Sequence, residues 1–393
     1  APYFTRPQSG VNHYVFDLAT VLPFKKQSQP ASRAEISNSV KNTEGGQGGY
    51  GTVRRTTLHL SHHHFSDYGT SSEPGVVAIK QLDSHNRADF QKEIDALLPF
   101  SHRNDKQLVK LLATYEVLDD NVSTFYLIFP WAEANLRSLW HTHEKGGDTV
   151  YNLHWISGQA LAIAKALEYM HEDYAKTFSD DPNSFDKQRF GRHGDIKAAN
   201  FLVFQRNKEV LIFLADFGLS RFYRQKTRSM EPPKAMSPSY RPPECDTTGG
   251  TLSRKSDIWS LGAFFLEFLT WYLKGWKGVS IEFPDFREAP DLEDGRGLVS
   301  DIFFTIRVEG NIKTAVVKEK VHRWISRLHS SKASTQFVHD MLDLVQEKML
   351  VVDKEKRITA GDLRKALQSI HEKCEKKENY LTPGRPYDEK KAK

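Results

Sequence analysis

The hydrophobic periodicity of this 393-residue chain changes near residue 133. Between about residues 37 and 133, short apolar runs such as VVAIKQL and FYLIFPW are typical of strands, and only ADFQKEIDALLPF has helical spacing. From residue 134 onward, long stretches such as DIWSLGAFFLEFLTWYL have helical spacing. The chain is therefore predicted to fold into a small sheet-rich unit followed by a larger, mainly helical one.

The segments outside this pattern are polar or irregular. Residues 1–36 mix prolines, serines and lysines without a sustained period, which predicts an extension that lies on the domain, and residues 373–393 are predicted to form a charged tail. Surface insertions are expected at 61–75, 171–191 and 283–297, because these stretches are rich in polar and loop-forming residues.

The composition excludes several classes of protein. With 39% apolar and 27% charged residues it is ordinary for a globular chain, and no run approaches the roughly 18 apolar residues that span a membrane. The start, APYFTRPQSG, lacks the pattern of a signal peptide, and its first residue, alanine, is typical of a processed product or a fragment. Two cysteines are too few for a disulfide framework, so we expect a cytoplasmic or nuclear protein, with no membrane partner.

The charge does not indicate a nucleic-acid partner. The formal net charge of +5 is small for this length, and the basic residues near the end are interleaved with glutamates. A nucleic-acid-binding chain would more usually show a basic stripe with a recognisable reading motif, and neither is found in this sequence. The oligomeric state is left open by the sequence.

A glycine-rich stretch, GQGGYGTV, begins at Gly46. Its glycines have the spacing that lets a backbone hairpin approach phosphate groups closely enough for N–H groups to donate. Taken alone, however, the stretch is better interpreted as a flexible turn.

Lys80 ends the predicted strand VVAIK, and Glu93 lies in the predicted helix that follows. A buried ammonium group needs a carboxylate partner, so in this order the residues favour a phosphate-binding pair over two surface charges.

A third constellation lies in HGDIKAAN, residues 193–200, and in LIFLADFG, which ends at Gly218. Asp195 and Asn200 are five residues apart on one predicted loop, and this suits two tasks, orienting a hydroxyl nucleophile and holding a metal ion. Asp216 adds a hard oxygen ligand of the kind that Mg²⁺ prefers. The sequence therefore predicts chemistry at a phosphoryl group.

Together these motifs resemble the protein kinase superfamily over roughly residues 37–370. Eight motifs occur in the order of that family: GQGGYGTV, VAIK, FQKEI, HGDIKAAN, DFG, PPE, SDIWSLG and DKEKRITA. The resemblance implies a two-lobed α+β fold, with a small antiparallel five-stranded lobe carrying one main helix at about 37–133 and a larger, mainly helical lobe at about 134–372. Some features, such as LIFPWAE, FLEFLTW and the insert before HGDIKAAN, resemble a subgroup of kinases from filamentous fungi.

The resemblance implies transfer of the γ-phosphoryl group of ATP, with Mg²⁺, to serine or threonine hydroxyls of a protein substrate. Lys80 and Glu93 would anchor the phosphates, Asp195 would be the catalytic base, and Lys197 would steady the transferred group. The two residues that would bind magnesium are Asn200 and Asp216. The residues that would surround the nucleotide, from the glycine-rich loop to the adenine pocket, are Gly46, Gly48, Gly51, Val53, Ala78, Lys80, Phe129, Pro130, Ala132 and Leu202.

Other positions would have structural roles in such a domain. The resemblance implies that Glu244 pairs with Arg357, and that Asp257 anchors a stack of buried side chains. That stack would consist of Leu97, Leu111, His193 and Phe217. Serine/threonine specificity is implied by Lys197 and by Ser237.

The sequence departs from the family at Gly194, which stands where kinases usually have an arginine that gathers a phosphorylated activation loop. We therefore expect an enzyme that is active without phosphorylation of that loop. Two alternatives stay open: a kinase-like scaffold that binds nucleotide and a protein partner, and a small-molecule phosphotransferase. The scaffold would be favoured by a missing catalytic group, whereas PPE, SDIWSLG and the RITA segment speak against the phosphotransferase.

Overall fold

The computed structural model describes residues 1–5, 7, 10–25, 51–65, 75–98, 101, 107–120, 122–146, 150–173, 189–206, 209–216, 221–224, 238–288, 300–384 and 386–387. The chain forms two compact units. We call Ala1–Leu139 with Ala199–Gly218 the sheet unit, and Trp140–Ala198 with Leu219–Lys393 the helical unit. This division confirms the predicted α+β class with one sheet-rich and one mainly helical part.

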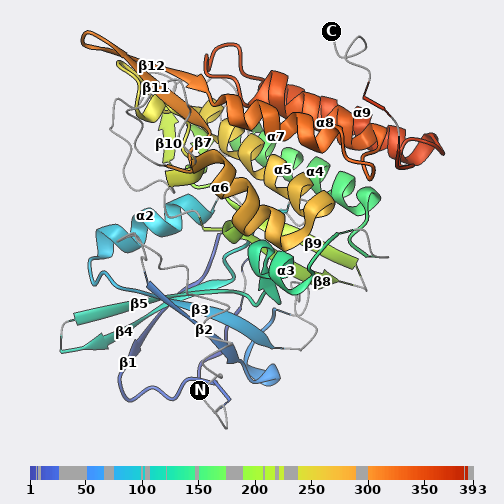
Figure 1. The fold of residues 1–393 in the computed structure, drawn as a ribbon. Coiled ribbons are helices and arrows are strands. Elements are labelled where there is room, and N and C mark those ends of the chain that lie inside the picture. The colour runs from blue at the N-terminus through green and yellow to red at the C-terminus, as the bar shows by residue number, and fades with distance from the viewer. Residues whose placement is uncertain are drawn as a thin grey trace, which may run out of the picture. The chain divides into compact units, whose positions relative to one another are not determined.

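The sheet unit contains a five-stranded sheet in the order β1-β4-β5-β3-β2 (Figure 1). Its strands are β1 (His13–Asp17), β2 (Gly51–Thr57), β3 (Val76–Leu82), β4 (Ala113–Asp119) and β5 (Val122–Pro130). Three of the four pairings are antiparallel, as predicted, but β1 pairs in parallel with β4. This edge strand comes from the segment that was expected to lie on the domain, because HYVFD alternates its side chains between the two faces of the sheet.

One face of this sheet is covered by the N-terminal segment. Val77, Ile79 and Ile128 form a buried cluster there with Tyr115, and Phe4 packs into it with no exposed surface. Other aromatic residues of the segment, Tyr14, Phe16 and Phe24, pack against the same cluster. The backbone of Phe4 also forms a β-bridge with His63. Its N–H donates to the His62 carbonyl oxygen at 2.8 Å, and its carbonyl oxygen accepts from the N–H of His64 at 3.0 Å. The predicted start of the kinase-like domain, after residue 36, lies outside the described residues. Its predicted end, residue 372, lies inside helix α9 (Ala360–Lys376).

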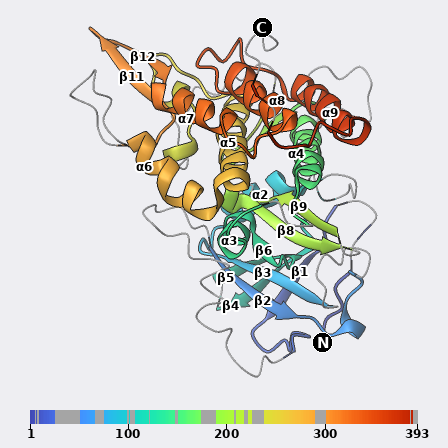
Figure 2. The ribbon, with the colours of Figure 1, turned by 45° about the vertical axis from the view of Figure 1, so that its right-hand side comes forward.

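Helix α2 (Arg87–Leu97) is the long helix of the sheet unit. It begins at Arg87 because the Asn86 side chain accepts a hydrogen bond from the backbone N–H of Ala88 at 2.8 Å, which caps the first turn. Its buried residues, Phe90, Ile94, Ala96 and Leu97, face inward. The sheet unit also contains a smaller three-stranded sheet, shown in Figure 2, of β6 (Ala134–Asn135), β8 (Phe201–Arg206) and β9 (Glu209–Leu214).

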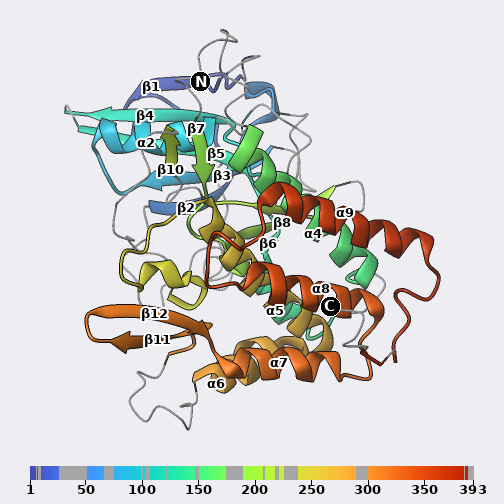
Figure 3. The same ribbon diagram turned by 90° about the horizontal axis from the view of Figure 1, so that it is seen from above.

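The helical unit is built around α5 (Arg254–Lys277), whose residues are buried along most of its length. Ser253 and Ser256 form a capping box at its start. The other helices are α4 (Leu153–Glu168), α6 (Phe283–Glu288), α7 (Glu319–His329), α8 (Gln336–Leu344) and α9 (Ala360–Lys376), whereas α3 (Leu136–Thr142) contains the boundary between the units. Helices α4 and α9 lie side by side (Figure 3), joined by an ion pair between Arg364 and Glu168 at 2.7 Å.

Two strand pairs complete the helical unit. β7 (Arg189–Arg192) pairs with β10 (Arg221–Arg224), and β11 (Phe304–Glu309) pairs with β12 (Ile312–Val317) in a hairpin that points away from the helices of this unit (Figure 1). Neither pair was predicted from the sequence. Within the described part of the chain, no helix combines the length and apolar character needed to cross a membrane.

Candidate active site

Lys80 lies on the face of the five-stranded sheet that is opposite the N-terminal aromatic residues. Its neighbours in the register are Val53 on β2 and Leu127 on β5, while Ala78 lies opposite Phe129. Because side chains alternate along a strand and directly opposed residues share a face, Val53, Ala78, Lys80 and Phe129 all point to the same side. Four residues that the sequence assigns to the nucleotide site therefore share one surface.

The predicted ion pair between Lys80 and Glu93 is present. The ammonium group of Lys80 is 2.7 Å from the Glu93 carboxylate on α2, and both side chains are largely buried. Burial alone would lower the pKa of Lys80, but the carboxylates of Glu93 and Asp216 outweigh it and raise the pKa above its ordinary value. Lys80 therefore stays cationic and fixed in direction, which suits contact with phosphate oxygens.

The apolar side of this site involves the segment that follows β5. Phe129, Ala132 and Leu202 pack against a buried cluster that contains Phe213 and Ala215. Phe129 also lies opposite Ala78 in the register, so it links this cluster to the Lys80 face. The segment is held to the smaller sheet by the backbone N–H of Glu133, which donates to the Val203 carbonyl oxygen at 3.0 Å.

Pro130 is the last residue of β5 and lies opposite Val77 at the end of the sheet. A proline there costs no ladder hydrogen bond, and its carbonyl oxygen remains an acceptor. The position is thus compatible with the predicted role of Pro130 as an acceptor beside the adenine.

The two residues predicted to bind magnesium lie in the same unit as Lys80. Asn200 ends a short 3₁₀ turn before β8, and its carbonyl oxygen accepts a hydrogen bond from the backbone N–H of Ala215 at 2.8 Å. The residue after Ala215 is Asp216, so this bond ties the two segments together. Asp216 has a backbone φ of 63°, in the left-handed region that few non-glycine residues adopt. Such strained backbone often occurs at functional positions.

The helical unit carries the other half of the predicted catalytic set. Asp195 is 9% exposed, and its carboxylate lies 2.8 Å from the ammonium group of Lys197. The backbone N–H of Asp195 donates to the Nδ1 atom of His193 at 3.2 Å. The loop is therefore fixed by local bonds that leave a carboxylate and a cation beside each other.

Asp257, in the first turn of α5, anchors the backbone of the loop at His193 and Gly194. Its carboxylate accepts hydrogen bonds from the backbone N–H groups of His193 at 2.8 Å and Gly194 at 2.9 Å, and lies 2.8 Å from the Nε2 atom of His171. Burial would raise the pKa of Asp257, but these bonds and the nearby His171 hold it below its ordinary value. The predicted anchoring role of Asp257 toward the His193 segment is confirmed at the level of these hydrogen bonds.

Gly194 has a backbone φ of +86°. A side chain at this angle is strained, so the glycine that replaces the expected arginine also suits the loop geometry that Asp257 stabilises. This link between Gly194 and backbone shape was not evident from the sequence.

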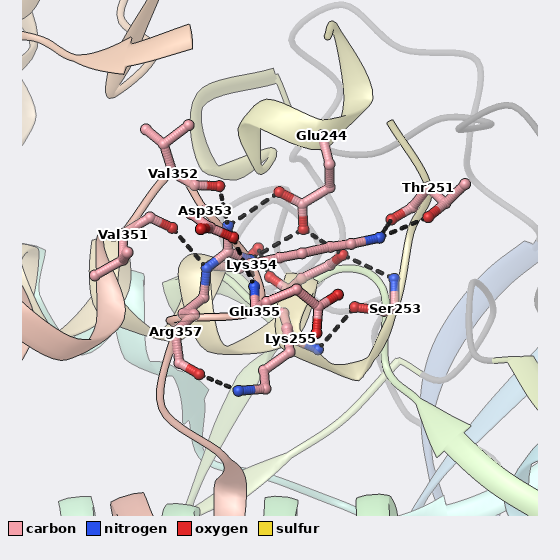
Figure 4. Close-up of polar contacts among 12 residues, drawn as sticks. Glu244, Thr251, Ser253, Lys255, Val351, Val352, Asp353, Lys354, Glu355 and Arg357 are labelled. Atoms are coloured by element: carbon pink, nitrogen blue, oxygen red, sulfur yellow. Dashed lines mark hydrogen bonds and ion pairs between the residues drawn. The ribbon is translucent and has the colours of Figure 1, made fainter. Parts of the chain in front are cut away.

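The predicted pair of Glu244 and Arg357 is confirmed (Figure 4). Both carboxylate oxygens of Glu244 accept from the guanidinium group of Arg357 at 3.0 Å, and the Ser256 hydroxyl donates to the same carboxylate at 2.7 Å. The Arg357 side chain is fully buried and donates further to the carbonyl oxygens of Val351 at 2.9 Å and Lys255 at 2.6 Å. This network joins three segments of the helical unit.

Several predicted residues lie outside the described part of the chain, namely Gly46, Gly48, Phe217 and Ser237. Gly51 is the first residue of β2. Leu97 and Leu111 are buried in the sheet unit, and their part in the stack stays a prediction. Among the described residues, no group of three or more His, Cys, Asp or Glu side chains is arranged to hold a metal ion.

Comparison with known proteins gives the family of this fold and site. A family model described as protein kinase domain matches residues 41–369. The chain is 29% identical to salt tolerance receptor-like cytoplasmic kinase 1 of Oryza sativa subsp. japonica over 231 residues, which covers 57% of this chain and 54% of that protein. It is 31% identical to proline-rich receptor-like protein kinase PERK15 of Arabidopsis thaliana over 235 residues, covering 57% of this chain and 37% of that protein.

A third relative, probable inactive receptor kinase RLK902 of Arabidopsis thaliana, is 31% identical over 197 residues, covering 50% of this chain and 26% of that protein. The matches thus span roughly half or less of the length of these relatives. Because the family model covers most of the sequence, the chain belongs to the protein kinase domain family.

Proposed function

We propose that this chain is a serine/threonine protein kinase that transfers the γ-phosphoryl group of ATP, with Mg²⁺, to a protein substrate. The observation that carries the proposal is the 2.7 Å ion pair between Lys80 and Glu93, on the sheet face that also holds Val53 and Ala78. Membership of the kinase family and relatives named as receptor-like kinases support it. Lys197, beside Asp195, supports serine/threonine specificity through the family resemblance.

The described residues fit a nucleotide and a magnesium ion. Val53, Ala78 and Leu202 would contact the adenine, with Phe129, Pro130 and Ala132 along its edge. The amide oxygen of Asn200 and the carboxylate of Asp216 are hard oxygen donors, which Mg²⁺ prefers. When bound there, Mg²⁺ would neutralise charge on the phosphate oxygens.

Each charged residue has a defined task in the proposed reaction. Lys80, held by Glu93, would donate to phosphate oxygens without having to reorient. The Asp195 carboxylate would orient the substrate hydroxyl and accept its proton as the new P–O bond forms, while the bond between the γ-phosphorus and the β–γ bridging oxygen breaks and ADP leaves. Lys197 would donate to the transferred phosphoryl group, whose negative charge it would offset. Because positioning and charge neutralisation dominate phosphoryl transfer, no covalent intermediate with the protein is needed.

The decisive experiment measures ³²P transfer from ATP with Mg²⁺ to generic protein substrates and to the chain itself. We compare wild type with Asp195→Asn and use Asp120→Asn, an exposed carboxylate in the turn after β4, as the matched control. Asp195→Asn is expected to reduce transfer by about 10² to 10⁴-fold, since general-base catalysis contributes that much. The control is expected to retain wild-type transfer, and hydrolysed product is expected to yield phosphoserine or phosphothreonine.

A second candidate is a kinase-like scaffold without catalytic activity, because one relative is named a probable inactive receptor kinase. Absence of transfer in wild type, combined with a rise in melting temperature on adding Mg-ATP, would support the scaffold. Phosphotyrosine as the product would contradict the proposed specificity.

A further inference from the structure

Strand β1 uses both faces of the sheet. Tyr14 and Phe16 pack into the aromatic cluster on the face covered by the N-terminal segment. Because side chains alternate, His13 and Val15 point to the opposite face, the one that carries Lys80 and helix α2. The five residues of β1 lie outside the range that the kinase family model matches, residues 41–369.

His13 contacts both β4 and α2. Its Nδ1 atom is 3.0 Å from the Thr114 hydroxyl, and its Nε2 atom is 3.5 Å from the Glu116 carboxylate. Its ring centroid lies 5.2 Å from that of Phe90 on α2. The backbone of this segment is fixed as well, since the N–H of Thr114 donates to the Asn12 carbonyl oxygen at 3.0 Å.

Glu116 connects His13 to the start of the helix. Both of its carboxylate oxygens accept from the Arg87 guanidinium group, at 2.9 and 3.1 Å, and the Glu116 side chain is only 5% exposed. Arg87 is the first residue of α2, where a nearby carboxylate also interacts favourably with the helix dipole. Glu116 therefore holds the first turn of α2 against the sheet.

This anchor lies one to two turns before Glu93. Phe90 stacks on Phe125 of β5 with ring centroids 4.4 Å apart, and Glu93 follows Phe90 by three residues on the same side of the helix. Because an α-helix is rigid over two turns, fixing Arg87 and Phe90 also fixes where Glu93 can reach. The 2.7 Å contact between Glu93 and Lys80 is then set partly by contacts made at β1.

We propose that strand β1 positions helix α2 within the sheet unit. His13, together with Glu116, would hold α2 in the position that brings Glu93 to Lys80. His13 is a positioning residue and touches no reacting group. The inference rests on the proposed kinase function wherever the measurement is catalytic.

The kinetic test compares His13→Ala with Val15→Ala. Val15 points to the same face of the sheet as His13, but its side chain is exposed. Its replacement by alanine therefore removes few contacts of β1. We expect His13→Ala to lower kcat/KM for ATP about 5-fold, since small displacements of catalytic groups are costly, and Val15→Ala to leave it unchanged. His13→Gln, which keeps a polar group near Glu116, is expected to recover most of the loss. Equal kinetics for His13→Ala and Val15→Ala would overturn the proposal.

A double mutant separates positioning from general weakening of the fold. If His13 acts through Glu93, adding His13→Ala to Glu93→Gln is expected to reduce kcat/KM by less than about 1.5-fold, because the effects of coupled residues are not additive. A full 5-fold further loss in that background would show that His13 does not act through Glu93.

Backbone hydrogen exchange tests the positioning without any catalysis. In His13→Ala, amides of α2 such as those of Ile94 and Leu97 are expected to exchange about 5-fold faster than in Val15→Ala, as local opening becomes easier. Identical exchange would overturn the proposal. If wild type transfers no phosphate at all, the proposed function fails, while this exchange comparison still decides whether β1 positions α2.

Discussion

At the scale of single residues, the glycine at position 194, where kinases usually have an arginine, is explained by its backbone conformation. Its φ of +86° is reached while its N–H donates to Asp257. We expect Gly194→Ala to lower the free energy of unfolding by about 1–2 kcal/mol, the cost of the left-handed region for a side chain. Because the strain falls next to Asp195, we also expect kcat to decrease.

The matched control is Gly310→Ala, in the turn between β11 and β12. Gly310 has a φ of +59° and no atom within 4 Å of the position that a β-carbon would take. It should lose similar stability in a urea titration without losing phosphoryl transfer. A Gly194→Ala variant with wild-type kcat would show that the loop tolerates the strain without consequence for Asp195.

His329 predicts a dependence of stability on pH. It stacks on Tyr387 with ring centroids 3.8 Å apart, and its Nδ1 atom lies 2.9 Å from that of His339. Burial first, and His339 second, lower the pKa of His329 from 6.5 to about 4. Below pH 6.5 His329 binds a proton in the unfolded chain, whereas in the folded chain it stays neutral until about pH 4. The free energy of unfolding therefore decreases as the pH falls from 6.5 to about 4.

The measurement is the free energy of unfolding of wild type and His329→Gln between pH 7 and pH 5. The proton of His329 contributes at most about 1.4 kcal/mol per pH unit to the wild-type slope, so the variant should have a slope that is shallower by up to this amount. Val308→Ala, at an exposed side chain without an ionisable group, is the control and should keep the wild-type slope. Parallel pH profiles for wild type and His329→Gln would rule out this histidine as the source.

At the scale of elements, the sequence predicted those whose signal is local. VVAIKQL coincides with β3, and the helical spacing around Glu93 and Asp257 predicted α2 and α5. The missed elements pair with distant partners: β1 lies beside β4, and β7 lies beside β10. A five-residue alternation such as HYVFD fits an exposed segment as well as an edge strand, because only the distant partner decides between them.

The candidate site was predicted to a similar degree. Lys80, Glu93 and the pair of Glu244 and Arg357 were predicted because motif order alone assigns partners to their charges. The contact of His13 with Glu116 and Phe90 was missed, since no motif includes His13. The only signal was the alternation of aromatic and polar residues around it, and that signal gains meaning once the sheet faces are known.

The network around Arg357 predicts a large stability effect. Arg357→Leu leaves the buried Glu244 carboxylate without its main partner, so we expect a loss of about 3–5 kcal/mol in the free energy of unfolding. The double variant Glu244→Leu with Arg357→Leu should be more stable than Arg357→Leu alone, because no buried charge is left uncompensated. Urea unfolding of each variant measures these differences.

The control for this network is Lys356→Leu, the adjacent residue. Its side chain is 79% exposed and its ion pair with Asp353 is long, at 3.7 Å. Exposed pairs of this kind contribute little, so a change below about 0.5 kcal/mol is expected. Comparable losses for Lys356→Leu and Arg357→Leu would mean that the effect is not specific to the buried pair.

At the scale of the whole molecule, the family match and the folded unit do not coincide. The model for the protein kinase domain begins at residue 41, yet Phe4 is fully buried against β3 and β5, and β1 completes the sheet. Removing residues 1–25 would expose this aromatic cluster to water, so the segment is part of the folded domain and not an appendage. Domain limits taken from motifs alone therefore start too late in this chain.

Nucleotide binding gives a whole-molecule prediction that needs no substrate. A ligand that binds only the folded state stabilises it, by about 2.7 kcal/mol when present at 100 times its Kd, so Mg-ATP is expected to raise the melting temperature of wild type. Lys80→Met should abolish most of this rise, because the phosphates lose the cation that Glu93 holds in place. Asp216→Asn, or chelation of Mg²⁺ with EDTA, should reduce it, since both remove a link between the triphosphate and the carboxylate.

The rise in melting temperature on adding Mg-ATP also separates nucleotide binding from catalysis. Asp195→Asn should keep the full rise, because its proposed task begins only with the substrate hydroxyl, and Asp120→Asn should behave as wild type. If Lys80→Met and wild type show the same rise, ATP binds somewhere other than the sheet face that carries Lys80. If Asp195→Asn loses the rise while Lys80→Met keeps it, the roles assigned to the two units are reversed, and Asp195 would have to be reinterpreted as a nucleotide-binding residue.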